Sequence, residues 1–91
     1  IVNMSSQMGH VGSPGRTVYC MTKHAVEGLT KAMAVELAPR SIRVNSVAPT
    51  FVATDWTARM FEDSQFKDFV LGMIPAGRLA SPEEVAAACL Y

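Results

Sequence analysis

The sequence predicts an α/β fold that forms part of a doubly wound parallel sheet. Three observations predict it: an apolar segment at 1–6, apolar residues at helical spacing across 18–38, and a second apolar segment at 42–48. A strand, a long crossover helix and a strand in this order normally form a right-handed unit with parallel strands. Because parallel strands are normally covered on both faces, we expect sequence outside this chain to complete the sheet.

The first strand is expected over Ile1–Ser6, an apolar run that ends in two serines. The loop Gln7–Arg16 follows, since it holds three glycines and a proline. The long helix is expected over Val18–Ala38, with Thr17 as its N-cap. Pro39 disfavours a helical conformation at the residue before it, so the helix is expected to end there.

The second strand is expected over Ile42–Ala48, and Pro49 stops it. The amphipathic segment Thr54–Met73 predicts two short helices. Ser81 is a helix N-cap, because a proline suited to the first turn and a glutamate that closes a capping box follow it. The last helix is therefore expected over Pro82–Tyr91.

Composition limits the classes of function. Hydrophobic residues make up 49% and charged residues 18% of the 91 residues, which is ordinary for a folded domain. The formal net charge is zero, so no basic field is expected to attract nucleic acid or anionic lipid. No apolar run approaches the roughly 20 residues of a membrane span, and the first residues do not read as a signal peptide.

The cysteines and histidines indicate neither a disulfide framework nor a metal site. Cys20 and Cys89 lie far apart in helix-like segments and are expected to be free thiols in a reducing, cytoplasmic compartment. His10 and His24 have no further ligand at metal-binding spacing and are expected on a loop and on a helix surface.

Three chemically useful side chains are expected at one edge of the sheet. Tyr19 and Lys23 are four residues apart at the start of the long helix, so they share one of its faces. Ser6 ends the first strand, and ligands of open α/β sheets bind at the carboxyl ends of the strands. An acid/base, a cation that tunes it and a hydroxyl that holds a carbonyl suit proton transfer at a carbonyl or alcohol.

The tuning of a tyrosine has an energetic requirement. A free tyrosine has a pKa near ~10, and lowering it by three units requires about 4 kcal/mol. An ammonium group roughly 4 Å away supplies about that much at an effective dielectric constant of about 20. Groups four residues apart are often more widely separated, so a cationic cofactor ring or a hydrogen-bond chain through a ribose would supply the rest. The structural alternative is a half-buried tyrosine beside a solvated lysine.

A longer pattern surrounds this triplet. Its segments are Asn3–Ser6, Tyr19–Lys23, Ala25–Thr30, Glu36–Ala38, Ile42–Pro49, Pro75–Arg78 and Ser81–Ala86. On these segments the chain resembles the short-chain dehydrogenase/reductase family, along essentially all of its length. The resemblance implies a Rossmann-like sheet, of which residues 1–91 are the partial catalytic half of one domain, with the N-terminal dinucleotide-binding half absent.

The resemblance also implies roles for individual residues. Ser6 would orient the substrate carbonyl, and Tyr19 would be the general acid in reduction and the base in oxidation. Lys23 would hold the nicotinamide ribose of NAD or NADP and tune the tyrosine. The implied cofactor-binding residues are Tyr19, Lys23, Pro49, Thr50, Val52 and Thr54. Thr50 stands where the family usually has glycine, which narrows the backbone freedom at that contact.

The substrate is less well specified than the reaction. The residues expected to contact it are Ser6, Gln7, Met8, Tyr19 and Phe51, under a lid formed by Trp56–Met73. This mixture of polar and apolar groups fits a small polyol, a keto acid and an acyl thioester about equally well. In the family the long helix commonly packs against a partner subunit, so a homodimer or homotetramer through Val18–Ala38 is expected.

The resemblance therefore implies an NAD(P)-dependent oxidoreductase that interconverts a ketone or aldehyde and an alcohol. The glycine-rich turn for the pyrophosphate, and the residue that selects NAD or NADP, are missing from the chain, so the isolated fragment is expected to be inactive. The alternative is a catalytically silent family member that acts as a binding or regulatory subunit. A serine hydrolase using Ser6 is rejected for want of a nucleophile elbow and a well-placed histidine.

Overall fold

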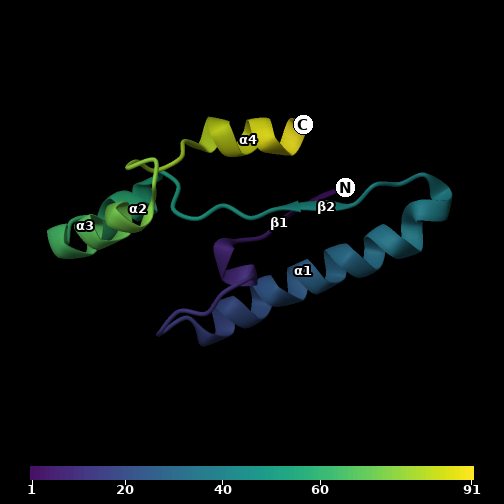
Figure 1. Ribbon diagram of the computed structural model, residues 1–91, viewed down its shortest axis with the longest axis horizontal. Helices are drawn as coiled ribbons and strands as arrows, with labels where there is room; N and C mark the ends of the chain where they lie inside the picture. Colours follow the sequence, from purple (N-terminus) through teal and green to yellow (C-terminus); the bar gives the residue numbers. More distant parts are fainter. The chain divides into compact units, whose positions relative to one another are not determined.

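The computed structural model describes residues 1–91 as two compact units, Ile1–Thr50 and Phe51–Tyr91. In the first unit, strands β1 (Val2–Met4) and β2 (Asn45–Val47) form a parallel pair. Helix α1 (Thr17–Leu37) connects them and lies along the strands (Figure 1). The predicted strand–helix–strand unit with parallel strands is therefore confirmed.

Both strands are shorter than the sequence predicts, but their pairing continues past their ends. The amide of Ser5 donates to the carbonyl of Val47 at 2.8 Å, and the amide of Gln7 donates to the carbonyl of Pro49 at 2.9 Å. The expected loop then begins with a short 3-10 turn, η1 (Gln7–Gly9). The segment that carries Ser6 is thus held against the chain that follows β2.

The two ends of α1 differ from their predictions. Thr17 is the first helical residue rather than the N-cap, and Arg16 occupies the N-cap without a side-chain hydrogen bond. At the other end, Ala38 keeps a right-handed helical conformation (φ −53°, ψ −42°) despite the proline after it. The restriction before proline is overcome because a new 3-10 turn, η2 (Ala38–Arg40), starts here, and proline fits the first turn of a helix.

Helix α1 places polar residues at its two buried positions, while Val26, Met33 and Leu37 are half-buried. Its buried residues are Glu27 and Thr30. Its exposed large apolar residues are Val18, Met21, Leu29 and Val35. Part of the apolar pattern of the helix, including Met21 and Leu29, therefore lies on a side that nothing in this chain covers.

The second unit contains three short helices, as the sequence predicts. They are α2 (Asp55–Met60), α3 (Ser64–Met73) and α4 (Pro82–Leu90). The side chains of Thr54, Asp63 and Ser81 cap them, and the predicted capping box between Ser81 and Glu84 is present. A parallel bridge between Val52 and Ala80 closes the unit. None of the helices in the chain combines the length and apolar character that a bilayer crossing requires.

Candidate active site

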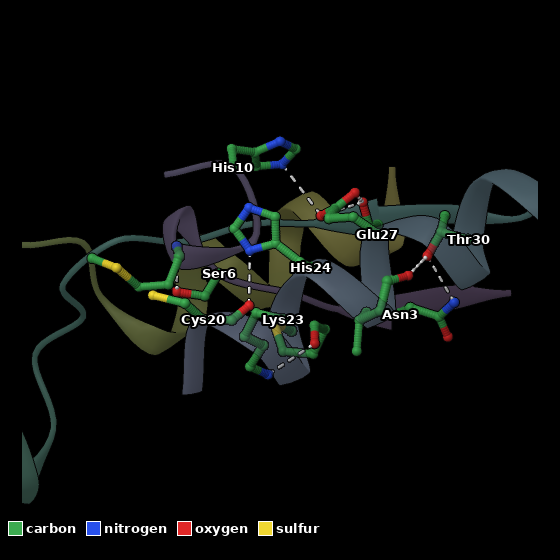
Figure 2. Close-up of polar contacts among 12 residues, drawn as sticks. Asn3, Ser6, His10, Cys20, Lys23, His24, Glu27 and Thr30 are labelled. Carbon is green, nitrogen blue, oxygen red and sulfur yellow. Dashed lines mark hydrogen bonds and ion pairs between the residues drawn. The ribbon is translucent and has the colours of Figure 1, made fainter. Parts of the chain in front are cut away.

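Lys23 joins the start of α1 to the end of β1. Its Nζ donates a hydrogen bond to the carbonyl of Met4, the last residue of β1, at 3.1 Å (Figure 2). The same ammonium lies 5.8 Å from the centre of the Tyr19 ring, over its face. Tyr19 is 42% exposed, so its ring remains open to a ligand. The structure therefore brings Tyr19 and Lys23 together at the carboxyl end of a strand, where the sequence predicts a ligand.

Ser6 lies two residues beyond the Lys23 contact and is buried. It is the N-cap of η1, and its Oγ accepts a hydrogen bond from the amide of Met8 at 3.1 Å. Because this bond uses a lone pair of the hydroxyl, its hydrogen remains available for donation. Ser6 can therefore donate a hydrogen bond to a carbonyl oxygen from a position fixed by the turn.

The other predicted residues of the first unit surround this turn. Thr50 Oγ1 donates to the side-chain oxygen of Gln7 at 2.9 Å, and the carbonyl of Pro49 accepts from the amide of Gln7. Met8 is half-buried and contributes the amide that binds Ser6. Thr50 thus holds the amide group of the Gln7 side chain through this hydrogen bond.

The predicted residues Phe51, Val52 and Thr54 belong to the second unit. Phe51 packs with Phe61 and Phe66, at ring-centre distances of 5.9 and 6.0 Å. The carbonyl of Val52 accepts a hydrogen bond from a threonine of α2, and Thr54 Oγ1 caps that helix. These contacts order the start of the second unit, and a role in cofactor or substrate binding stays a prediction.

Sequence reasoning missed a buried carboxylate beside the turn. Glu27 on α1 is 7% exposed, and both of its oxygens accept from Ser46 Oγ, at 3.1 and 3.0 Å. His10, expected as a solvated loop residue, places Nε2 3.3 Å from Glu27 Oε1 (Figure 2). The spacing in the sequence could have indicated Glu27, because it follows Tyr19 and Lys23 at successive intervals of four residues on one helix face.

The surroundings of Glu27 favour its charged form. The hydroxyl of Ser5, then that of Ser46, and the charges of His10 and Lys31 lower its pKa from the usual value, although burial acts in the opposite direction. Ser5 Oγ is buried and has no hydrogen bond of good geometry. We therefore assign the hydrogen bond to the Glu27 carboxylate to Ser46, and to Ser5 only the effect of a nearby hydroxyl dipole.

One hollow of the surface does not coincide with these groups. It has a volume of about 550 Å³. Its lining residues come from the last turns of α1 and from the chain that leads into β2: Ala34, Ala38, Ser41, Ile42, Arg43, Val44 and Asn45. Ser6, Tyr19 and Lys23 do not line this hollow. We therefore place the candidate site where these polar side chains lie rather than at the hollow.

Comparison with known proteins agrees with this fold. A family model described as enoyl-(acyl carrier protein) reductase matches residues 1–91. The chain belongs to the short-chain dehydrogenase/reductase family.

Two curated relatives match over the whole chain. The 3-oxoacyl-(acyl-carrier-protein) reductase FabG of Thermotoga maritima is 47% identical over 91 residues, and carbonyl reductase family member 4 of Xenopus laevis is 46% identical over 91 residues. These matches cover 100% of this chain but 36% of each relative. The chain thus spans about a third of the length of the curated relatives it matches.

A solved structure shows the same relation. A putative NAD(P)-dependent gluconate 5-dehydrogenase from Beutenbergia cavernae, with bound NADP, superposes with a TM-score of 0.88 at 40% identity. The match covers 97% of this chain and 36% of the other. The chain therefore forms part of a Rossmann-like α/β fold with a parallel sheet, as predicted.

Proposed function

We propose that the protein containing this chain is an NAD(P)-dependent oxidoreductase that interconverts a ketone or aldehyde and an alcohol, with Tyr19 as the general acid and base. The observation that carries the proposal is the position of Lys23. Its ammonium binds the Met4 carbonyl at 3.1 Å and lies 5.8 Å from the centre of the Tyr19 ring. A lysine that merely solvated a helix surface would not be tied to the end of a strand beside a tyrosine.

In the reducing direction, the hydroxyl of Ser6 donates a hydrogen bond to the substrate carbonyl oxygen and holds it in place. The phenol of Tyr19 transfers its proton to that oxygen as negative charge develops there. In the oxidising direction, Tyr19 takes the proton back from the alcohol. The ammonium of Lys23 stabilises the phenolate that remains after reduction, and the positive N-terminal end of α1 acts in the same sense.

The residues present fit the nicotinamide side of NAD or NADP. An ammonium group has three donors and the Met4 carbonyl accepts from one, so Lys23 keeps two for the hydroxyls of a ribose. When bound, the cofactor supplies or accepts the hydride at the carbonyl carbon. The relative from Beutenbergia cavernae holds NADP. We propose that Pro49, Thr50, Val52 and Thr54 complete the contacts in the whole protein.

The apolar side of α1 supports an assembly of identical subunits. Met21 is 63% exposed, Leu29 is 53% exposed and Val35 is 78% exposed, all on the side of the helix away from the strands. Ala25 and Gly28 lie among them and permit close approach of a second helix. We propose that two copies of α1 pack together here in a homodimer or homotetramer.

The activity belongs to the whole protein rather than to residues 1–91. Val44 and Val70 are the only buried hydrophobic residues, and β1 exposes the apolar side chains of Val2 and Met4. We propose that the remaining two thirds of the protein cover these strands and bind the cofactor pyrophosphate. The free thiols of Cys20 and Cys89 suit the reducing conditions of the cytoplasm.

The proposal is tested on the full-length protein in two stages. The fluorescence of NADH and of NADPH is first titrated with protein, and saturable binding of at least one of them is expected. The loss of cofactor absorbance is then followed with a polyol-derived ketone, a keto acid and a 3-oxoacyl thioester. Turnover of at least one carbonyl compound is expected.

The outcomes separate the proposal from its alternative. Saturable cofactor binding without turnover of any carbonyl class would favour the binding or regulatory subunit. Failure to bind either nucleotide would contradict both readings. Turnover that survives the loss of the Tyr19 hydroxyl would contradict the role proposed for that residue.

A further inference from the structure

We propose that Glu27 is a positioning residue, which fixes the turn bearing Ser6 against the helix bearing Tyr19 and Lys23. This inference rests on the proposed function, because its catalytic consequence acts through Ser6. No hydrogen bond joins Glu27 to Ser6 or Tyr19, and its carboxylate instead joins three parts of the first unit. The three are α1, β2 and the segment Ser5–His10.

The contacts of the Glu27 carboxylate come from β2 and from the segment Ser5–His10. Ser46, in β2, donates to both carboxylate oxygens. His10, directly after η1, lies 3.3 Å from one of them. Ser5, just after β1, is 4% exposed, and its Oγ lies near Glu27, because a Cβ added at Gly9 would be 2.7 Å from Ser5 Oγ and 2.9 Å from Glu27 Cγ. A buried charge is costly unless several groups compensate it, so this arrangement holds its members in one geometry.

Gly9 shows how tightly the turn meets the helix. A Cβ at Gly9 would lie 2.7 Å from Ser5 Oγ, 2.9 Å from Glu27 Cγ and 3.1 Å from the carbonyl oxygen of Lys23. The turn η1 therefore rests directly on the α1 residues that follow Tyr19 by one and two turns. Only a residue without a side chain permits this approach, and Glu27 is the side chain on which the turn rests.

The position of Ser6 depends on this packing through the backbone of the turn. Its Oγ is oriented by the amide of Met8, and its carbonyl accepts from the amide of Gly9 at 2.8 Å. A shift of Gly9 away from α1 therefore moves the hydroxyl that would hold the substrate oxygen. A displacement of 1 Å in a reacting group can lower a rate about 100-fold.

The test compares Glu27→Gln with Glu83→Gln in the full-length protein. Both substitutions remove one carboxylate charge at nearly constant size, but Glu83 is exposed and its side chain forms no hydrogen bond or ion pair. Hydrogen exchange of the amides of residues 7–11 is measured by mass spectrometry. We expect about 10-fold faster exchange in Glu27→Gln, because the His10 contact and one acceptor oxygen are lost, and unchanged exchange in Glu83→Gln.

A double-mutant cycle with Ser6→Ala gives the catalytic readout. We expect Glu27→Gln to lower kcat about 10-fold in the wild-type background and less than about 2-fold in the Ser6→Ala background, with the affinity for the nicotinamide nucleotide unchanged in both. Should Glu27→Gln fail to fold, Ser46→Ala replaces it, since it removes the donor to the carboxylate and leaves the charge.

The outcomes distinguish this inference from the proposed function. Unchanged exchange at residues 7–11 would overturn the positioning role, whether or not the protein is an enzyme. Faster exchange with equal, additive losses of kcat in both backgrounds would also overturn it, because Glu27 would then act independently of Ser6. The proposed function fails separately, when the wild-type protein reduces no carbonyl compound.

Discussion

The two sides of α1 carry different kinds of residue, and both of its buried residues are polar. The side toward the strands carries Tyr19, Lys23, Glu27 and Thr30 at successive intervals of four, four and three residues. Lys23 binds the end of β1, Glu27 binds β2, and Thr30 accepts a hydrogen bond from the Asn3 side chain in β1 at 3.0 Å (Figure 2). The opposite side carries exposed apolar residues.

We infer from this difference that the two faces have different tasks. The polar face fixes reactive groups through directional contacts, which tolerate little displacement. The apolar face makes few contacts within the chain, and a contiguous exposed apolar surface of this kind normally marks an interface. A substitution on the first face is therefore expected to change the chemistry, and a substitution on the second to change the assembly.

Lys23→Ala tests the polar face. After the substitution of Tyr19, it is expected to have the largest effect on activity. Loss of the ammonium removes the charge beside the Tyr19 ring and the donors for the ribose. We expect kcat/KM to fall by about 100-fold or more, and alcohol oxidation to require a higher pH. Steady-state rates from pH 6 to pH 10 check both effects, and an unchanged pH profile would show that Lys23 does not tune the tyrosine.

Leu29→Glu tests the apolar face. A carboxylate at the centre of a helix–helix interface has to lose its hydration, so we expect the subunit dissociation constant to rise by about 100-fold or more. Sedimentation velocity of the full-length protein measures the shift, with Leu29→Met as the control that keeps the apolar contact. An assembly of unchanged size in Leu29→Glu would place the interface elsewhere.

Gly9→Ala tests the approach of η1 to the polar face. The added methyl group meets Ser5, Glu27 and the Lys23 carbonyl, so we expect the turn to move and kcat/KM to fall about 10-fold. Gly12→Ala is the matched control, because a Cβ at Gly12 has nothing within 4 Å. Equal activities of the two variants would mean that the turn tolerates displacement.

The smallest expected effect concerns an ion pair of the second unit. Arg78 donates two hydrogen bonds to Glu84 at 2.9 and 2.7 Å, which lowers the pKa of Glu84 from 4.5 to about 2. A lowered pKa stabilises the fold above pH 4.5, and this contribution is lost as the pH falls toward 2.

The measurement compares the thermal unfolding midpoints of the full-length protein and of Glu84→Gln. We expect a small advantage of the wild type at neutral pH, because the Arg78–Glu84 pair is exposed. That advantage is expected to shrink below pH 4.5, where the wild type begins to lose its carboxylate. A difference that does not depend on pH would show that the ion pair does not stabilise α4.

Local patterns in the sequence were sufficient to predict the elements and the reactive triplet. Helical spacing identified α1, the Ser81 capping box identified α4, and the interval of four brought Tyr19 and Lys23 to one face. These features depend on residues close in the chain, and such contacts follow from helix geometry alone.

Contacts across the chain were not predictable in the same way. The partners of Glu27 are 17 to 22 residues away in both directions. Its burial depends on the register of β1 against β2 and on the approach allowed by Gly9. The apolar spacing of α1 also did not predict which of its apolar residues would be exposed. Periodicity shows that a helix has an apolar face without showing what covers that face.

The central claim is that the Tyr19 hydroxyl transfers the proton to the substrate. The most direct test is the single-turnover rate of carbonyl reduction by full-length Tyr19→Phe, with Tyr91→Phe as the control that makes the same change at the chain's other tyrosine. We predict that Tyr19→Phe keeps its fold and nucleotide affinity but loses about 1000-fold or more in rate, while Tyr91→Phe reacts like the wild type. A folded Tyr19→Phe that retains near-normal turnover would contradict the account.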